Sequence, residues 1–146
     1  QDAEGDYAAT IVSGANLHIA AADLTDDAVW AGVSVLILQN EVTEATNLAA
    51  AREARKRGVK TVLNAAPWRP LGAELRGFVD ILVVNAVEAE MMGTEPVCCL
   101  PSAAEAAKRL ADQFETAIVT AGSLGLAAWG ATRSGWPGAG PCCTGG

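Results

Sequence analysis

The stretch ILVVNAVEAEMMG, from Ile81 to Gly93, decides the fold class of this chain. It begins with four apolar residues, three of them β-branched, which predict a strand buried in the core, as in a parallel sheet. The strand stops at Asn85, and a short helical pattern follows at once. A buried strand that leads directly into a helix is typical of α/β proteins, in which ligands bind outside the carboxyl ends of the strands.

Asn85 and Glu88 admit two interpretations. Asparagine is a preferred residue at a helix N-cap, and an acid three residues later completes a capping box. Alternatively, an amide and a carboxylate at the carboxyl end of a parallel strand face a ligand. Taken alone, the two residues favour capping, because helix caps are far commoner than ligand sites.

Strand-like and helix-like segments alternate along the rest of the chain. The predicted strands are Tyr7–Val12, Val33–Gln39, Lys60–Leu63, Ile81–Val84, Thr116–Thr120 and Leu126–Trp129. The predicted helices are Leu24–Ala31, Thr43–Arg57, Leu71–Val79, Val87–Met92 and Ser102–Phe114. This alternation predicts an α/β fold with a mostly parallel, Rossmann-like sheet and helices on both of its faces.

Two of these helices carry clear end signals. In the first, Thr43 is the predicted N-cap, basic residues crowd the last turn, and Gly58 follows as the residue that ends the helix. In the second, Ser102 is the predicted N-cap and Glu105 completes a capping box.

The composition bounds the class of protein. A chain of 146 residues that is 51% hydrophobic predicts one domain with a buried core. A net charge of −7 argues against nucleic acid or an anionic membrane as a partner. The sequence contains no apolar run of about 18 residues, so no transmembrane helix is predicted. It contains no basic-then-apolar leader that would predict secretion. We therefore expect a cytoplasmic protein.

The cysteines occur as two adjacent pairs, Cys98-Cys99 and Cys142-Cys143. This spacing matches neither a zinc site nor a C-x-x-C redox motif. Disulfide bonds between the two pairs are one alternative. Four thiols in a reducing compartment are the favoured one.

Polar or small residues follow four of the predicted strands. They are Gln39-Asn40-Glu41, Asn64, Asn85 and Thr120-Ala121-Gly122. Because the carboxyl ends of parallel strands meet at one edge of a sheet, we expect these residues to line a cleft there.

The order of motifs in residues 5–130 resembles the central part of the ribokinase and wider PfkB carbohydrate kinase family. The matching pieces are SGAN (13–16), LQNE (38–41), LNAAP (63–67), VDILVVNAVEAE (79–90) and TAGSLG (120–125). The family versions read close to GAN, LQLE, NPAP, VDIxxxNxxEAE and TxGxxG. Each piece is weak alone, but five pieces in the family's order make a specific match.

The resemblance implies a nucleotide side of the site. Asn85 and Glu88 match the family motif that holds the phosphates of magnesium–ATP, where the glutamate acts on Mg²⁺ through metal-bound water. Such a site suits a hard cation that prefers oxygen ligands and keeps several waters. Thr120, Gly122 and Gly125 match the turn beside the nucleotide, where glycine lets the backbone approach a phosphate closely.

The resemblance also implies a sugar side and a reaction. Glu41 matches a family position near the sugar, and Asn64 begins the NPAP-like turn. Judged by residue type alone, a turn-forming role for Asn64 is as well supported as a role at the sugar side. The implied reaction is ATP- and Mg-dependent phosphorylation of a hydroxyl group on a sugar such as ribose.

Two parts of the family pattern have no counterpart. One is the family's N-terminal part, which carries glycine-rich sugar-binding motifs. The other is the family's D-T-x-G-A-G-D segment, which supplies an anion hole and the catalytic base, on which phosphoryl transfer depends. Gly138-Ala139-Gly140 precedes Pro141 rather than an aspartate, and no acidic residue follows Glu115. His18, the only histidine, is better explained as a turn residue than as a base. We therefore expect negligible kinase activity from the chain alone.

Three readings follow from these observations. The favoured one is a truncated ribokinase-like domain over residues 1–130, followed by an irregular tail rich in Gly, Pro and Cys over residues 131–146. The second is a module without chemistry that binds nucleotide or self-associates through an exposed sheet edge. The third, an α/β enzyme that uses a different base, is the weakest.

Overall fold

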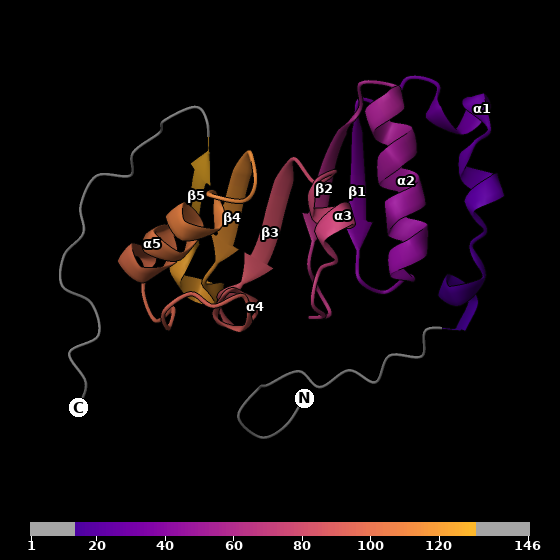
Figure 1. Ribbon diagram of the computed structural model, residues 1–146. Coiled ribbons are helices and arrows are strands. Elements are labelled where there is room, and N and C mark those ends of the chain that lie inside the picture. The colour runs from indigo at the N-terminus through magenta and orange to yellow at the C-terminus, as the bar shows by residue number, and fades with distance from the viewer. Residues whose placement is uncertain (1–13, 131–146) are drawn as a thin grey trace.

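A computed structural model describes residues 14–130 of the chain as a five-stranded sheet with helices packed against it (Figure 1). The strands are β1 (Val35–Gln39), β2 (Lys60–Asn64), β3 (Ile81–Asn85), β4 (Thr116–Thr120) and β5 (Leu126–Gly130). Their order in the sheet is β1-β2-β3-β4-β5. Strands β1 to β4 pair in parallel and β5 pairs antiparallel to β4, which confirms the mostly parallel sheet.

Helical segments connect the strands. They are η1 (Gly14–His18), η2 (Ala21–Leu24), α1 (Asp27–Trp30), α2 (Glu44–Lys56), α3 (Ala73–Arg76), α4 (Ala86–Met91), α5 (Leu100–Leu110) and η3 (Gly122–Leu124). Two predicted helices are shorter than expected. The pattern over residues 24–31 divides into two short turns, and the one over residues 71–79 retains only α3, since Gly72 and Gly77 flank it. The predicted strand over residues 7–12 and the tail over residues 131–146 lie outside the described residues.

Helix α2 begins and ends where its sequence predicts. Thr43 is the N-cap, and its side chain accepts a hydrogen bond from the backbone N–H of Thr46. Gly58 follows with a φ of 70°, a left-handed conformation that glycine adopts without steric cost.

Helix α5 begins two residues earlier than its sequence predicts. Cys99 is the N-cap, and Ser102 lies at the third helical position, so the predicted cap at Ser102 with Glu105 is wrong. Pro101 did not delay the start, because proline is tolerated in the first helical turn, where its missing N–H has no partner to lose. The Ser102 hydroxyl instead accepts the backbone N–H of Cys99 at 3.1 Å.

Cys98 and Cys99 are both disulfide-bonded, so the expectation of free thiols is wrong for these two residues. Disulfide formation depends on the distance and direction of two Cβ atoms, which the spacing of cysteines along a chain does not reveal.

Within residues 14–130 the helices cover one face of the sheet. The strand order follows the chain without reversal, and right-handed crossovers of that kind place successive helices on the same side. Helix α2 packs against β1 and β2, and α5 against β4 and β5 (Figure 1). The expectation of helices on both faces is therefore met on one face only in this part of the chain. On the other face, Val35 and Ile37 are 48% and 70% exposed.

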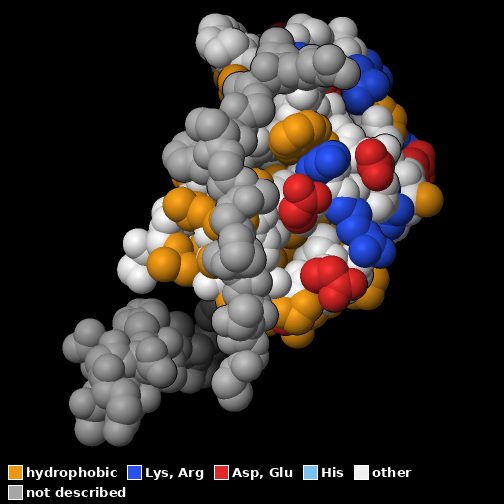
Figure 2. All heavy atoms as spheres, turned by 90° about the vertical axis from the view of Figure 1, so that its left-hand side faces the viewer, with side chains coloured by type: hydrophobic (Ala, Val, Ile, Leu, Met, Phe, Trp, Pro, Cys, Tyr) orange, Lys and Arg blue, Asp and Glu red, His pale blue; other side chains and the backbone are white. Residues whose placement is uncertain are grey.

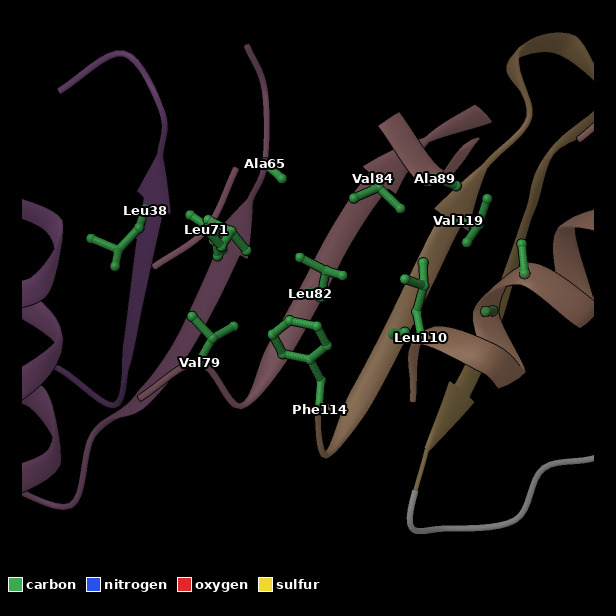
Figure 3. Packing of buried hydrophobic residues seen from close by; sticks show 14 of the residues in the cluster. Leu38, Ala65, Leu71, Val79, Leu82, Val84, Ala89, Leu110, Phe114 and Val119 are labelled. Carbon is green, nitrogen blue, oxygen red and sulfur yellow. The ribbon is translucent and has the colours of Figure 1, made fainter. Parts of the chain in front are cut away.

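The main core lies between this covered face and the helices. Its members come from all five strands and from α2 to α5, and Figure 3 shows Leu82, Val84, Val119 and Leu110 converging there. Leu63 is fully buried in the same cluster. A smaller cluster of Trp30, Ala54 and Val59 packs at the C-terminal end of α2.

The asymmetry between the two faces predicts unequal costs for the same kind of truncation. Leu63→Ala should lower the free energy of unfolding by about 2–5 kcal/mol, because it leaves a cavity in the core. Ile37→Ala should lower it by less than about 0.5 kcal/mol, because Ile37 is mostly exposed. Urea denaturation followed by circular dichroism measures both. Equal losses would show that the open face is covered in solution.

Candidate functional site

The sheet register brings the predicted site residues to one edge. Gln39 pairs with Asn64, and Asn64 with Val83, two residues before the end of β3. Asn85 pairs with Thr120 in the next strand. The carboxyl ends of β1, β2, β3 and β4 therefore form a single row of polar residues, as expected for a ligand edge of an α/β sheet.

Asn85 and Glu88 form a complete capping box at the start of α4. Asn85 Oδ1 accepts the backbone N–H of Glu88 at 2.8 Å, and Glu88 Oε2 accepts the backbone N–H of Asn85 at 2.9 Å. The capping interpretation of the two residues is thus confirmed. It does not exhaust their chemistry, because the Asn85 side-chain amide keeps two N–H donors and Glu88 keeps its second oxygen.

Glu88 lies in an unusual environment for a carboxylate. Glu88 is only 6% exposed, and it forms no ion pair with any residue in the range 14–130. A buried carboxylate is costly unless it is paired or hydrogen-bonded. A capping bond to one oxygen leaves the other available for a cation or for a water bound to one.

The turn after β4 lies next to this capping box. Thr120 is in register with Asn85, and its hydroxyl lies 3.4 Å from the carbonyl oxygen of Val84. Gly122 and Gly125 have φ values of 57° and 103°, which disfavour any residue with a side chain. A Cβ atom at Gly122 would meet no atom within 4 Å, so the glycine serves the backbone conformation and leaves the surface beside it open.

The sugar-side residues lie at the other end of the row. Glu41 follows β1, is half-buried, and lines a hollow of about 340 Å³ together with Asn16 from the SGAN motif. Asn64 ends β2 and does not line this hollow. The structure thus brings the SGAN and LQNE motifs together. His18 is exposed on η1.

Two residues to which the sequence gave no individual role lie beside Glu41: Asn40, expected only as one of the polar residues after a strand, and Arg69. Asn40 is 6% exposed, and its side-chain amide donates to the carbonyl oxygen of Ala65 at 3.0 Å. Arg69 Nη1 donates to the carbonyl oxygen of Val42 at 2.7 Å. The only sequence signal for a particular role of Asn40 was its position in LQNE, where the LQLE pattern has leucine.

The opposite edge of the sheet carries a charged cluster. Lys60 Nζ lies 2.5 Å from Glu115 Oε2 and 3.4 Å from Asp80 Oδ1, at the amino ends of β2 to β4. Hydrogen bonding to Glu115, with the charge of Asp80, raises the pKa of Lys60 above its usual value. Asp80 also accepts the backbone N–H of Thr61 at 2.7 Å. These contacts connect the amino ends of β2, β3 and β4, at the edge of the sheet opposite the candidate site.

The charges on the α5 side of the molecule are mixed. Figure 2 shows acidic and basic side chains intermingled there, and Glu105, Lys108, Arg109 and Asp112 line a shallow hollow on that side. A surface of this kind lacks the single-signed stripe of a nucleic-acid interface.

Among residues 14–130, no helix combines the length and apolarity needed to cross a membrane. No group of three or more His, Cys, Asp or Glu side chains in residues 14–130 is placed to hold a metal ion by itself. A magnesium ion does not need such a group, because it is commonly bound through one or two carboxylates and the phosphates of its nucleotide.

Sequence relatives of the chain are ribokinases. The chain is 36% identical to the ribokinase of Haemophilus influenzae over 118 residues, which is 80% of this chain and 39% of the relative. It is 34% identical to the ribokinase of Mus musculus over 125 residues, 84% of this chain and 39% of the relative. The chain thus spans about two fifths of the length of these curated relatives. No family model matches it.

Solved structures of the same fold agree. Sa239 superposes with a TM-score of 0.78 at 29% identity, over 90% of this chain and 44% of Sa239. Arabidopsis thaliana ribokinase, solved with ribose and ATP, superposes with a TM-score of 0.71 at 24% identity. That match covers 85% of this chain and 41% of the plant protein, and at this identity it shows the fold alone.

The capping box predicts a stability effect that is separate from any ligand. Asn85→Ala should lower the free energy of unfolding by about 1 kcal/mol, since the backbone N–H of Glu88 loses its acceptor. Asn85→Asp should retain most of the stability, because aspartate is an equally good cap. Urea denaturation curves of the three proteins measure the difference. An alanine variant as stable as the unmodified chain would contradict the cap.

Proposed function

We propose, from the premise that this chain is part of a ribokinase-type member of the PfkB carbohydrate kinase family, that it carries the nucleotide side of a sugar kinase site. The parent reaction is transfer of the γ-phosphoryl group of ATP to a hydroxyl group of a ribose-like sugar, with Mg²⁺. The observation that supports it most is the placement of the Asn85–Glu88 capping box directly beside the Thr120–Gly125 turn.

The residues present fit magnesium–ATP. Glu88 offers one uncapped carboxylate oxygen in a buried setting, which suits Mg²⁺ bound through water. Asn85 offers its side-chain N–H groups to a phosphate oxygen. The open backbone at Gly122 suits a phosphate group that approaches closely, and Gly125 provides the positive φ that the turn needs. Magnesium–ATP would supply the phosphoryl group, and these residues would bind and orient it.

The sugar side is proposed for Glu41 and Asn64. Glu41 is a half-buried acceptor in a hollow, a setting in which a carboxylate binds sugar hydroxyls. Asn64 lies between Gln39 and Val83 in the row of strand ends. The plant relative solved with ribose and ATP makes ribose the first sugar to test.

We expect binding without turnover. No residue in this sequence matches the family's catalytic aspartate, and no acidic residue follows Glu115. Among the described residues proposed for the site, Glu88 is committed to the cap and the cation, and Glu41 is the other carboxylate. Glu41 matches the family's sugar-side position and not its base, so we assign no residue to accept the sugar proton.

The nucleotide side is tested by magnesium–ATP titration in a calorimeter. Glu88→Gln should weaken magnesium–ATP binding at least tenfold and leave magnesium-free ATP little affected, because the amide still caps the helix but carries no charge for the cation. Glu105→Gln is the matched control, since Glu105 is exposed on α5, away from the row of strand ends.

Two outcomes would count against the nucleotide proposal. A folded protein that binds no magnesium–ATP would leave Asn85 and Glu88 as a helix cap only. Equal losses in the Glu88 and Glu105 variants would trace the effect to net charge rather than to the site.

The second candidate is a module that self-associates. It is favoured by the exposure of Val35 and Ile37 on β1, which is an edge strand among the described residues. Apolar, unpaired edges promote pairing with another chain. A cytoplasmic location and the absence of a nucleic-acid partner stay predictions from composition.

Self-association is tested by sedimentation velocity over a range of concentrations. The second candidate predicts a concentration-dependent dimer that Ile37→Lys abolishes, because a charge on the edge strand opposes pairing. A monomer at every concentration would exclude it.

A further inference from the structure

Asn40 joins the ends of β1 and β2 through its side chain and its backbone. Its Nδ2 donates to the carbonyl oxygen of Ala65 at 3.0 Å, and its backbone N–H donates to the carbonyl oxygen of Ala66 at 2.9 Å. The residue immediately before Ala65 is Asn64, and the residue immediately after Asn40 is Glu41. Both proposed sugar-side residues therefore adjoin this one set of bonds.

Arg69 holds the other side of the Glu41 peptide. Its Nη1 donates to the carbonyl oxygen of Val42 at 2.7 Å and lies 3.4 Å from that of Asn40. These two carbonyls belong to the residues on either side of Glu41. The Glu41 backbone is thus anchored at both neighbours, while its carboxylate forms no ion pair within residues 14–130.

The two residues joined by the side-chain hydrogen bond, Asn40 and Ala65, both differ from the family motifs. Asn40 stands where LQLE has leucine, and Ala65 stands where NPAP has proline. Proline fixes φ without help, whereas alanine leaves the turn free to move in the absence of another restraint. Ala65 also donates its backbone N–H to the carbonyl oxygen of Val83 at 3.0 Å, a bond that proline cannot form.

From these contacts we propose that Asn40 and Arg69 are positioning residues, and that Asn40 restrains the turn at Ala65 in place of proline. Together they fix Glu41 and Asn64 relative to each other at the sugar side. The inference rests on the proposed function for the role of Glu41 and Asn64. The restraint itself rests on the hydrogen bonds alone.

The burial of Asn40 separates this role from general stabilisation. Its Oδ1 is buried and has no hydrogen-bond partner among the described residues. Asn40→Leu removes that unpaired Oδ1, but it also deprives the carbonyl oxygen of the fully buried Ala65 of its side-chain donor, so its two effects on the free energy of unfolding oppose each other. A positioning role therefore predicts a loosened turn with a loss of global stability no larger than that caused by the same substitution at a comparable buried asparagine.

Asn47 provides a matched control. It is also buried, its Nδ2 donates to the carbonyl oxygen of Gln39 at 2.8 Å, and its Oδ1 is likewise without a partner in the described part of the chain. Asn47→Leu thus makes the same chemical change in the same region without touching the turn at Ala65.

The test compares Asn40→Leu, Asn47→Leu, Ala65→Pro and the double variant Asn40→Leu with Ala65→Pro. Amide hydrogen exchange at residue 40, measured by NMR, reports the bond to Ala66. We expect exchange there to be about three- to tenfold faster in Asn40→Leu, the range that loss of one buried hydrogen bond gives. Asn47→Leu should leave it unchanged, and the double variant should return it toward the original rate. The urea midpoint of Asn40→Leu should be no lower than that of Asn47→Leu, because each variant leaves one backbone carbonyl oxygen without its side-chain donor.

Ribose titration of the same proteins tests the link to function. Asn40→Leu should weaken ribose binding about tenfold and leave magnesium–ATP binding unchanged, and the double variant should recover ribose affinity. If the unmodified chain binds no ribose, the proposed sugar side fails, and the exchange rates still decide the restraint.

Several results would overturn the inference. Exchange at residue 40 that stays within twofold in Asn40→Leu, or that rises equally in Asn47→Leu, would show that Asn40 does not restrain the turn. A double variant that exchanges as fast as Asn40→Leu, beside an Ala65→Pro variant that exchanges like the unmodified chain despite losing the bond to Val83, would exclude the substitution for proline. Unchanged ribose affinity in Asn40→Leu would exclude the positioning role.

Discussion

The parallel register of β1 to β4 is the constraint on which the rest of the structure depends. Because each parallel strand ends at the same edge, residues that are far apart in the sequence become neighbours, as Asn85 and Thr120 do. The crossovers that parallel pairing requires place α2 and α5 on one face and bury the core there. The same register therefore builds both the hydrophobic core and the candidate site.

At this edge the groups that bind ligand are also the groups that end secondary structure. The side chains of Asn85 and Glu88 accept each other's backbone N–H groups at the start of α4 and still present an uncapped oxygen and side-chain N–H donors. Capping and ligand binding are thus compatible uses of one pair of residues, because each side chain has more hydrogen-bonding capacity than the cap consumes. Gly122 in the turn after β4 also has two uses, since it adopts a positive φ and leaves the surface beside it open.

Sequence patterns predicted most of this architecture, and the failures have identifiable causes. Thr116–Thr120 is a strand with the predicted bounds, and Thr43 caps α2 as predicted. The start of α5 was misplaced, because a residue of weak capping preference, Cys99, took the cap ahead of Ser102. The sequence showed Asn40 among the polar residues that follow a strand but not its bond to Ala65, because the acceptor is a carbonyl group 25 residues away along the chain. Long-range hydrogen bonds leave no periodic trace in a sequence.

By itself, the sequence determined the alternation of strands and helices, the polar residues that follow the strands, and the family to which the motifs point. These are local properties, set by side-chain type, apolar periodicity and turn chemistry. Only the tertiary structure decided which face of the sheet the helices cover, which strand ends are adjacent, and which buried amide joins Glu41 to the turn after Asn64. Those outcomes depend on the pairing order of the strands and on contacts between distant segments, which arise only when the chain folds.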